Sequence, residues 1–358
     1  MKTKKSEFTI SIVGIGTELG SEVRTAEELG KRFSLTADDV TSKTGVTQLL
    51  FSKITLESLG FRAIKKIPQL DLSRVSGIFG SSNPTGTYLM PTPTAAIAAK
   101  LGLCPVIVDH IGLGCAGGLQ ALRNTYNQLA IDTLKNKISY YIVWAGDNTS
   151  LICEPGNEKT AFLFSEGAAA LLVTNDPTVQ MGYRIKTIDT KSLLGPKVYA
   201  LSLENPYHFR GTPKIEMQGG SLFRFGVEIL PDMLGLVGLK KLDKDMYLIP
   251  HQANLRMLDA MIRRFKLDSD HVYTEGISTI GNTSPSAVFF GLEDALRRKL
   301  IPTGCDKIIL GAFGAELQVG AVLLEPLEHT DGFIPKEETK EEKEEKNSED
   351  SQASESNQ

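Results

Sequence analysis

The stretch VIVDHIGLGCAGGLQAL, residues 106–122, carries the pattern that decides the fold. A β-branched apolar run comes first, closely spaced glycines follow, and apolar residues then recur at helical spacing. Residues 246–260, MYLIPHQANLRMLDA, repeat this order of strand, loop and helix. Similar apolar runs alternate with helical segments along most of the chain, which predicts an α/β fold with largely buried strands.

The expected strands and helices fall into two similar series. Strands are expected at residues 8–16, 75–82, 104–110, 138–146, 169–175, 246–250, 306–313 and 319–326, and helices at 121–134, 255–265 and 286–300. This similarity indicates an internal duplication, with an N-terminal half at 1–176 that carries Cys115 and a C-terminal half at 177–330 that carries His251. The two residues are expected at equivalent places, each at the carboxyl end of a strand, where open α/β sheets collect their chemistry. Chance similarity between two α/β halves is the alternative.

Composition and charge exclude several classes of protein. The formal net charge of −4 is dominated by residues 336–358, which carry nine acidic residues and four lysines and leave +1 for the rest. A nearly neutral body argues against a nucleic-acid-binding protein, which normally has a strongly basic face. We expect residues 331–358 to form a disordered acidic tail, because residues 336–358 offer almost no core-forming side chains. No apolar run is long enough for a transmembrane helix, so no membrane partner is expected.

Cysteine and histidine spacing indicates neither disulfides nor a metal site. The four cysteines lie at positions 104, 115, 153 and 305 without a CxxC pair, and the five histidines show no metal-ligand spacing. A cytoplasmic location is therefore expected.

The segment GIGTELG, residues 14–20, invites a dinucleotide-binding interpretation because it follows a strand. Its third glycine comes one position late for the G-x-G-x-x-G fingerprint, and polar, helical residues follow in place of a second strand. We reject that interpretation and expect a turn that leaves the first strand.

Cys115 has surroundings that suit a reactive thiol. Small residues on both sides, from Gly112 to Gly118, leave room for a substrate. A helix that starts here directs free N–H groups and the positive end of its dipole at the sulfur, which lowers the pKa of the thiol and favours the nucleophilic thiolate. A tight helix–strand contact that requires small residues explains the segment equally well.

His251 and Asn282 are weak signals when each is taken alone. His251 follows a buried strand in LIPHQAN, where a structural histidine is common. Asn282 precedes Ser284 and Pro285 in IGNTSPSA, and a turn before a helix start explains it.

Four segments taken together form an ordered set: GCAGG (114–118), PHQAN (250–254), GNTS (281–284) and FGA (313–315). The set resembles the thiolase superfamily, and most closely its β-ketoacyl-[acyl-carrier-protein] synthase III class of condensing enzymes. The resemblance extends from about Ile10 to Glu325. It implies a five-layer αβαβα fold built from two duplicated halves, and a homodimer.

The resemblance also implies catalytic roles. Cys115 would take an acyl group from a thioester, and His251 and Asn282 would support decarboxylation of a malonyl thioester and attack of the resulting enolate. Backbone N–H groups of Cys115 and Ala315 would form the oxyanion hole. The physical logic is sound, because thioester exchange divides one difficult step into two and uncharged donors stabilise an enolate oxygen.

Substrate contacts follow from the same resemblance. Asn254 and Phe313 belong to the matched segments and are expected to bind substrate. Arg256 matches a position that helps to receive an acidic carrier protein or cofactor phosphates, although a solvated helix charge is an equal alternative. Met90 matches a position that reaches toward the partner subunit's acyl pocket. The substrates would be thioesters of coenzyme A or of an acyl carrier protein, with no further cofactor.

Several positions depart from the family pattern. Members of this class sandwich the adenine of coenzyme A between a tryptophan and an arginine, and the counterparts here are Val40 and either Asn157 or Glu158. Lys43 replaces the arginine that usually precedes Thr-Gly. Glu316 replaces a common glycine, and its role is left open. The usual coenzyme A clamp is therefore absent or rebuilt.

The leading hypothesis is a condensing enzyme of fatty-acid or polyketide-like secondary metabolism, which joins an acyl group on Cys115 to a malonyl-type or β-ketoacyl-type thioester. Acyl transfer from Cys115 to an oxygen or nitrogen nucleophile, without C–C bond formation, is the alternative. A non-catalytic subunit is a third possibility, and the presence of Cys115, His251 and Asn282 together argues against it.

Overall fold

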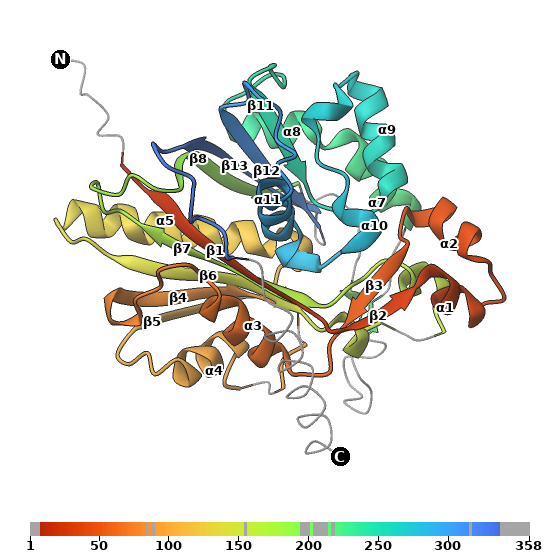
Figure 1. Ribbon diagram of the computed structural model, residues 1–358, viewed down its shortest axis with the longest axis horizontal. Helices are drawn as coiled ribbons and strands as arrows, with labels where there is room; N and C mark the ends of the chain where they lie inside the picture. Colours follow the sequence, from red (N-terminus) through yellow and green to blue (C-terminus); the bar gives the residue numbers. More distant parts are fainter. Residues whose placement is uncertain are drawn as a thin grey trace.

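The computed structural model describes residues 8–83, 85–87, 90–153, 156–193, 201–202, 214–215, 219–314 and 317–336 (Figure 1). The strands of the first half are β1 (Ser11–Leu19), β2 (Glu22–Thr25), β3 (Gln48–Phe51), β4 (Val75–Ser81), β5 (Ile107–Ile111), β6 (Tyr140–Asp147) and β7 (Gly167–Thr174). Its helices are α1 (Ala26–Lys31), α2 (Ala37–Thr44), α3 (Leu56–Lys65), α4 (Pro93–Lys100), α5 (Gly117–Leu134) and α6 (Glu158–Ala161), with short 3₁₀ helices η1 (Leu72–Arg74), η2 (Gly114–Ala116) and η3 (Thr149–Leu151).

The second half begins at β8. Its strands are β8 (Tyr183–Ser192), β9 (Leu201–Ser202), β10 (Lys214–Ile215), β11 (Met246–Pro250), β12 (Lys307–Phe313) and β13 (Gln318–Pro326). Its helices are α7 (Gly219–Glu228), α8 (Leu230–Leu236), α9 (Leu255–Phe265), α10 (Gly276–Thr279) and α11 (Ala287–Arg297), with 3₁₀ helices η4 (Ser269–His271) and η5 (Ser284–Ser286).

The two halves repeat one strand order. The main sheet has nine strands in the order β11-β12-β13-β8-β1-β7-β6-β4-β5, and β1 joins β8 through two residue pairs. In the first half β5, β4 and β6 are parallel, and β7 and β1 alternate in direction beyond them. In the second half β11 and β12 are parallel, and β13 and β8 alternate beyond them. Val272 forms a parallel bridge with Leu248 on β11, in the place that β5 takes beside β4.

This correspondence corrects one expectation. Cys115 follows β5, whereas His251 follows β11, whose counterpart is β4. The two residues are therefore not at equivalent places. The counterpart of the Cys115 loop is the segment before α11, which contains Asn282.

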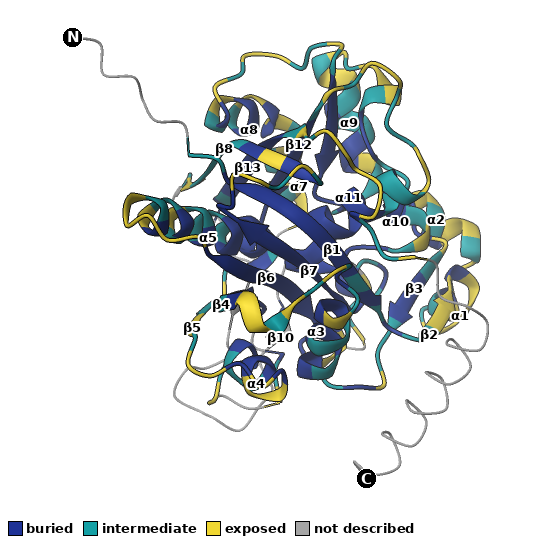
Figure 2. Ribbon diagram, turned by 60° about the vertical axis from the view of Figure 1, so that its left-hand side comes forward, coloured by how far each residue is buried: buried dark blue, intermediate teal, exposed yellow. Residues whose placement is uncertain are grey.

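The elements form the expected αβαβα layers. α5 and α11 lie in the middle, since α5 contacts β4 and β6 on one side and β8 and β13 on the other, while α11 contacts β11 and β12 as well as β1 and β7. α3 and α4 cover the first half of the sheet from outside, and α8 covers the second. Figure 2 shows that the central strands β1, β6 and β7 are almost entirely buried. One apolar core continues through both halves, so a boundary at residue 176 stays a prediction.

The glycines of the segment 14–20 have a packing role. Gly14 and Gly16 lie inside β1, so the expected turn is wrong. A Cβ built on Gly16 would lie 2.2 Å from the backbone oxygen of Ala63 in α3. The glycine therefore lets α3 pack directly on the strand, and no dinucleotide loop exists there.

The start of the predicted tail belongs to the fold. Phe333 is 1% exposed, and its carbonyl oxygen accepts a hydrogen bond from Ile15 N–H of β1 at 3.1 Å. Its ring also meets that of Tyr183 edge-on. The tail expected from residue 331 therefore starts too early, and residues 337–358 lie outside the described part.

Candidate active site

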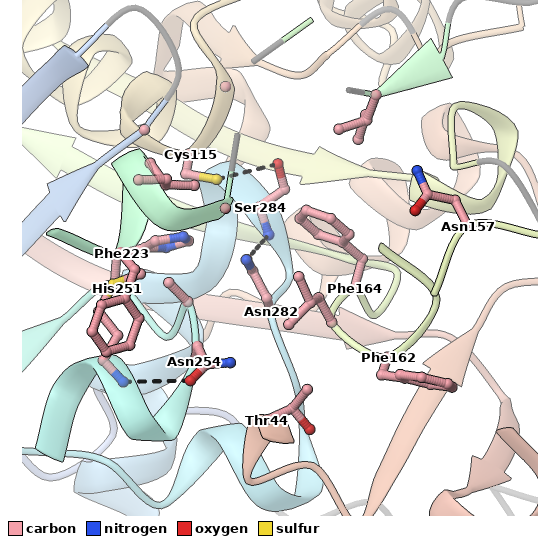
Figure 3. A pocket seen from close by; sticks show the side chains of 18 of the residues that line it. Thr44, Cys115, Asn157, Phe162, Phe164, Phe223, His251, Asn254, Asn282 and Ser284 are labelled. Carbon is pink, nitrogen blue, oxygen red and sulfur yellow. Dashed lines mark hydrogen bonds between the residues drawn. The ribbon is translucent and has the colours of Figure 1, made fainter. Parts of the chain in front are cut away.

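A cavity of about 820 Å³ lies at the carboxyl ends of β4, β11 and β12. Cys115, His251 and Asn282 all line it, although they come from three separate parts of the chain (Figure 3). Most of the remaining wall is apolar: Phe162, Leu163, Phe164, Ile215, Leu222, Phe223, Met257 and Phe313. The structure thus gathers the three predicted catalytic residues around a single apolar space.

Cys115 lies in η2, directly before α5. A Cβ built on Gly314 would lie 2.8 Å from the backbone nitrogen of Cys115, so glycine is needed for β12 to end this close. The residue is partly exposed to the cavity, but protein atoms surround its sulfur. Burial is the main cause that raises the pKa of the Cys115 thiol to about 12; the Asp147 charge adds to it, and the Ser284 hydrogen bond opposes it.

The expected lowering of the Cys115 pKa is therefore wrong. Loss of solvation outweighs the favourable end of the helix dipole, because a thiolate in an apolar space lacks the water that would stabilise it. At neutral pH the residue rests as a thiol, and its proton must leave during the reaction.

His251 directly follows β11 and is 2% exposed. Its backbone N–H donates to the Gly311 carbonyl oxygen at 2.7 Å, and its ring meets the Phe313 ring edge-on at 5.6 Å between centroids. Within the described residues Nδ1 has no hydrogen-bond partner and is buried, so Nε2 is the nitrogen that serves the cavity. Burial lowers the pKa of His251 to about 3, which keeps the imidazole neutral at physiological pH.

Asn282 is held by its backbone and by its amide oxygen. Its N–H donates to Leu163 O at 3.0 Å, and its carbonyl oxygen accepts from Ser165 N–H at 3.0 Å. Oδ1 accepts from the backbone N–H of Ser284 at 2.9 Å, as the dashed line in Figure 3 shows. With the oxygen occupied, the side-chain NH₂ is the group that can donate to a ligand in the cavity.

A buried polar cluster beneath Cys115 was not anticipated from the sequence. Asp147 is fully buried and accepts hydrogen bonds from Asn83 N–H at 2.8 Å, Asn83 Nδ2 at 2.7 Å and Thr85 Oγ1 at 3.0 Å. Asn83 Nδ2 also donates to Ser284 Oγ at 3.1 Å. Burial raises the pKa of Asp147 to about 6. A signal was present, since Asp147 is the charged residue that ends the otherwise uncharged strand YYIVWAGD.

At the cavity mouth an ion pair joins α2 and α6, the two segments in which the resemblance locates the coenzyme A clamp. Lys43 of α2 donates to Glu158 of α6 at 2.5 Å, and both residues line the cavity with Asn157. Asn254 caps α9 and donates to the backbone oxygen of Lys43 at 3.3 Å. Val40 is fully buried among the side chains of α1 and α2 and does not reach the mouth.

The remaining expected contacts divide into two groups. Asn254 and Phe313 line the cavity, whereas Arg256 and Met90 are not part of its wall. Met90 is 85% exposed on the single chain. Ala315 and Glu316 lie outside the described residues, so the predicted oxyanion hole stays a prediction.

Comparison with known proteins agrees with this architecture. The family described as 3-oxoacyl-[acyl-carrier-protein (ACP)] synthase III matches residues 110–192, and its C-terminal counterpart matches residues 238–325. β-Ketoacyl-[acyl-carrier-protein] synthase III 1 of Vibrio vulnificus is 26% identical over 332 residues, covering 87% of this chain and 98% of the relative. The Prochlorococcus marinus synthase III is 27% identical over 332 residues, covering 88% and 96% respectively.

Solved structures share the fold. The 3-oxoacyl-(acyl carrier protein) synthase III of Pseudomonas aeruginosa PAO1 has a TM-score of 0.77 at 24% identity, covering 89% of this chain and 98% of that one. The priming β-ketosynthase of the R1128 polyketide biosynthetic pathway has a TM-score of 0.74 at 22% identity, covering 89% and 96%. The solved structures share the fold of this chain, and the family models match a part of each half. Over most of its length the chain is therefore similar to the β-ketoacyl-[acyl-carrier-protein] synthase III proteins.

The described residues offer neither a membrane-spanning helix nor a cluster of metal ligands. No helix in this part of the chain has the length and apolar character needed to cross a membrane. Among the same residues, no group of three His, Cys, Asp or Glu side chains could hold a metal ion.

Proposed function

We propose that this protein loads an acyl group onto Cys115 and condenses it with a malonyl-type thioester. The observation that carries the proposal is the single apolar cavity shared by Cys115, His251 and Asn282. A thiol, a neutral imidazole and a primary amide are the groups that this two-step chemistry requires. The pathway would be fatty-acid or polyketide-like biosynthesis, which the names of the similar proteins support.

In the first step the Cys115 sulfur attacks the carbonyl carbon of an acyl thioester. A new C–S bond forms to Cys115, the original C–S bond breaks, and the proton of Cys115 ends on the departing thiol. Because the Cys115 thiol is protonated at rest, the proton must move as the bond forms. We assign this transfer to His251, because its imidazole is neutral at physiological pH and lines the same cavity.

In the second step the malonyl thioester loses CO₂, and the electron pair of the broken C–C bond stays on the thioester as an enolate. The enolate carbon attacks the acyl carbon, a C–C bond forms, and the C–S bond to Cys115 breaks. A proton returns the sulfur to the thiol state. We assign stabilisation of the enolate oxygen to the imidazole of His251 and the NH₂ of Asn282, because donors without charge are cheaper to desolvate in an apolar cavity.

The proposal includes the partners of the reaction. Acyl and malonyl groups would arrive on coenzyme A or an acyl carrier protein in the cytoplasm, and catalysis would need no metal or further cofactor. A homodimer would form along the edge of the sheet at β5, where Ile107 and Val108 are 40% and 41% exposed. Exposed apolar residues on an edge strand favour pairing with another chain. Met90 would then reach toward the partner subunit, and Arg256 would receive the acidic carrier.

Intact-mass spectrometry tests the proposal. The protein is incubated with acyl-coenzyme A and acyl-carrier thioesters, and malonyl carrier is then added. We expect acylation that Cys115→Ala abolishes, followed by release of CO₂ and a β-ketoacyl product. His251→Ala and Asn282→Ala should each lower the rate of condensation by about 10²–10³, and Asn282→Ala should still be acylated.

The same experiment separates the competing functions. Acyl-Cys115 that discharges only onto alcohols or amines would identify an O- or N-acyltransferase. No acylation from any donor would identify a non-catalytic subunit. Condensation by Asn282→Ala at a near-normal rate would disprove the role assigned to its amide.

A further inference from the structure

Ser284 is the polar side chain in contact with the Cys115 sulfur. Its Oγ lies 3.9 Å from Cys115 Sγ, and the residue is 2% exposed (Figure 3). Asn83 Nδ2 donates to this Oγ at 3.1 Å, which occupies a lone pair of the hydroxyl oxygen. The hydroxyl hydrogen therefore remains available, and the sulfur is an acceptor within reach.

The backbone of Ser284 is in a conformation that non-glycine residues rarely adopt. Its φ is +58°, in the left-handed region. The hydrogen bond from Ser284 N–H to Asn282 Oδ1 helps to hold this conformation. Strain of this kind persists where the surrounding structure over-determines it, and it commonly marks a functional position.

Hydrogen bonds to Asp147 hold Asn83 in place. Both its backbone N–H and its Nδ2 donate to the carboxylate of Asp147, which is fully buried. Thr85 donates to the same carboxylate, and within the described residues no hydrogen bond joins Thr85 to Ser284. In the described part of the chain no cation forms an ion pair with Asp147, so these neutral donors compensate its charge. A chain of contacts thus runs from Asp147 through Asn83 and Ser284 to Cys115.

We propose that Ser284 donates a hydrogen bond to the Cys115 sulfur as the thiol loses its proton, and that Asn83, anchored on Asp147, positions Ser284 for this role. The inference rests on the proposed function of Cys115 as the nucleophile. Ser284 touches the reacting atom, whereas Asn83 and Asp147 act through it. The donor offsets part of the desolvation that disfavours a thiolate in this cavity.

Alkylation by iodoacetamide tests the proposal without any acyl donor. The rate of Cys115 labelling is followed by peptide mass spectrometry between pH 7 and 10. Because a hydrogen bond to a charged group is worth about tenfold or more, Ser284→Ala should slow labelling about tenfold and move the pH profile upward by about one unit. Ser284→Gly should have the same effect although it removes the backbone strain. A loss with alanine alone would assign the effect to strain and overturn the proposal.

Two matched controls keep the test specific. Cys153 resembles Cys115 in that burial and the charge of Asp147 both raise its pKa. No hydrogen bond to Ser284 is among the causes of its shift, so its labelling rate should not change in the Ser284 variants. Asn83→Ala should slow Cys115 labelling in the wild-type background but not in Ser284→Ala. Thr85→Val removes a different donor to Asp147 and should leave Cys115 labelling within about twofold of wild type.

The titratable groups around this chain of contacts are Cys115, His251 and Asp147, with Cys153 and Glu166 behind it. Ser284 is also close enough to Asp147 to stabilise its charged form. If the hydroxyl served Asp147 alone, the Ser284 variants would leave Cys115 labelling unchanged, and the proposal would fail. That result would not affect the proposed function, which stands or falls on acylation and condensation.

Discussion

Gly118 decides how closely the helix that follows Cys115 approaches the segment that carries Asn282. A Cβ built on Gly118 would lie 2.3 Å from the backbone oxygen of Pro285 in η5, more than 1 Å inside the 3.4 Å at which ordinary contact begins. Further contacts would fall at 3.2 Å from Phe289 and 3.3 Å from Ala145. The nearest atom belongs to the backbone, so no side-chain rotation can relieve the overlap.

Two opposing effects set the magnitude of the Gly118→Ala substitution. Alanine in a helix interior is normally favoured over glycine by about 1 kcal/mol. Overpacking of a well-filled core costs about 1–3 kcal/mol and can cost more. Because the overlap is with backbone and exceeds 1 Å, we expect the packing cost to win and the free energy of unfolding to fall by about 1–2 kcal/mol.

Gly235 in α8 provides the matched control. A Cβ there has no heavy atom within 4 Å, so Gly235→Ala should raise the free energy of unfolding by a few tenths to about 1 kcal/mol. Urea unfolding of both variants at one protein concentration measures the difference, provided that the m-values agree. If the two variants were equally stable, the close approach of α5 to η5 could not be what requires glycine at position 118.

His251→Gln and Glu158→Gln test two further features. The folded-state pKa of His251 is about 3, so the unfolded chain binds the proton first as pH falls below about 6.5. The contribution of His251 to the free energy of unfolding is therefore complete above that pH and declines below it. In urea unfolding, the difference in free energy of unfolding between wild type and His251→Gln should shrink by about 2–3 kcal/mol from pH 7.5 to pH 4.5. A difference that stays constant would refute the burial argument. Glu158→Gln releases the Lys43 charge at the cavity mouth, so kcat/KM for an acyl-coenzyme A should rise about two- to fivefold at low salt. The neutral N-acetylcysteamine thioester should show no gain, and an equal gain for both donors would exclude an electrostatic cause.

Much of the fold could be predicted from periodicity. The expected strand at 246–250 and helix at 255–265 coincide with β11 and α9, because both are apolar segments with clear boundaries. β8 was not among the expected strands, because its sequence YRIKTIDTKS is too polar to stand out. Hydrogen bonds to the neighbouring strands β13 and β1 stabilise β8 as a strand, although its composition does not predict one.

The site was only partly accessible to the same reasoning. Cys115, His251 and Asn282 were found because their segments resemble those of a family. The thiol pKa was misjudged, since local sequence shows the helix start but neither the burial of the thiol nor the apolar walls of the cavity, to which Phe223 and Phe313 contribute. Asp147 and Asn83 escaped notice because the contacts that connect them to Ser284 join positions far apart in the chain.

The position of α5 between the two halves has a consequence for synthesis. One face of the helix packs on β4 and β6, which precede or closely follow it in the chain, but the other face packs on β8 and β13. When only the first half has emerged from the ribosome, the second apolar face of α5 is therefore still exposed to water. The 3₁₀ helix η2 that carries Cys115 also contacts β12, β13 and η5, so its surroundings are complete only when β13, which ends at Pro326, has been made. Under the proposed function, we therefore expect emerging chains to gain reactivity toward thioesters only when synthesis is nearly complete.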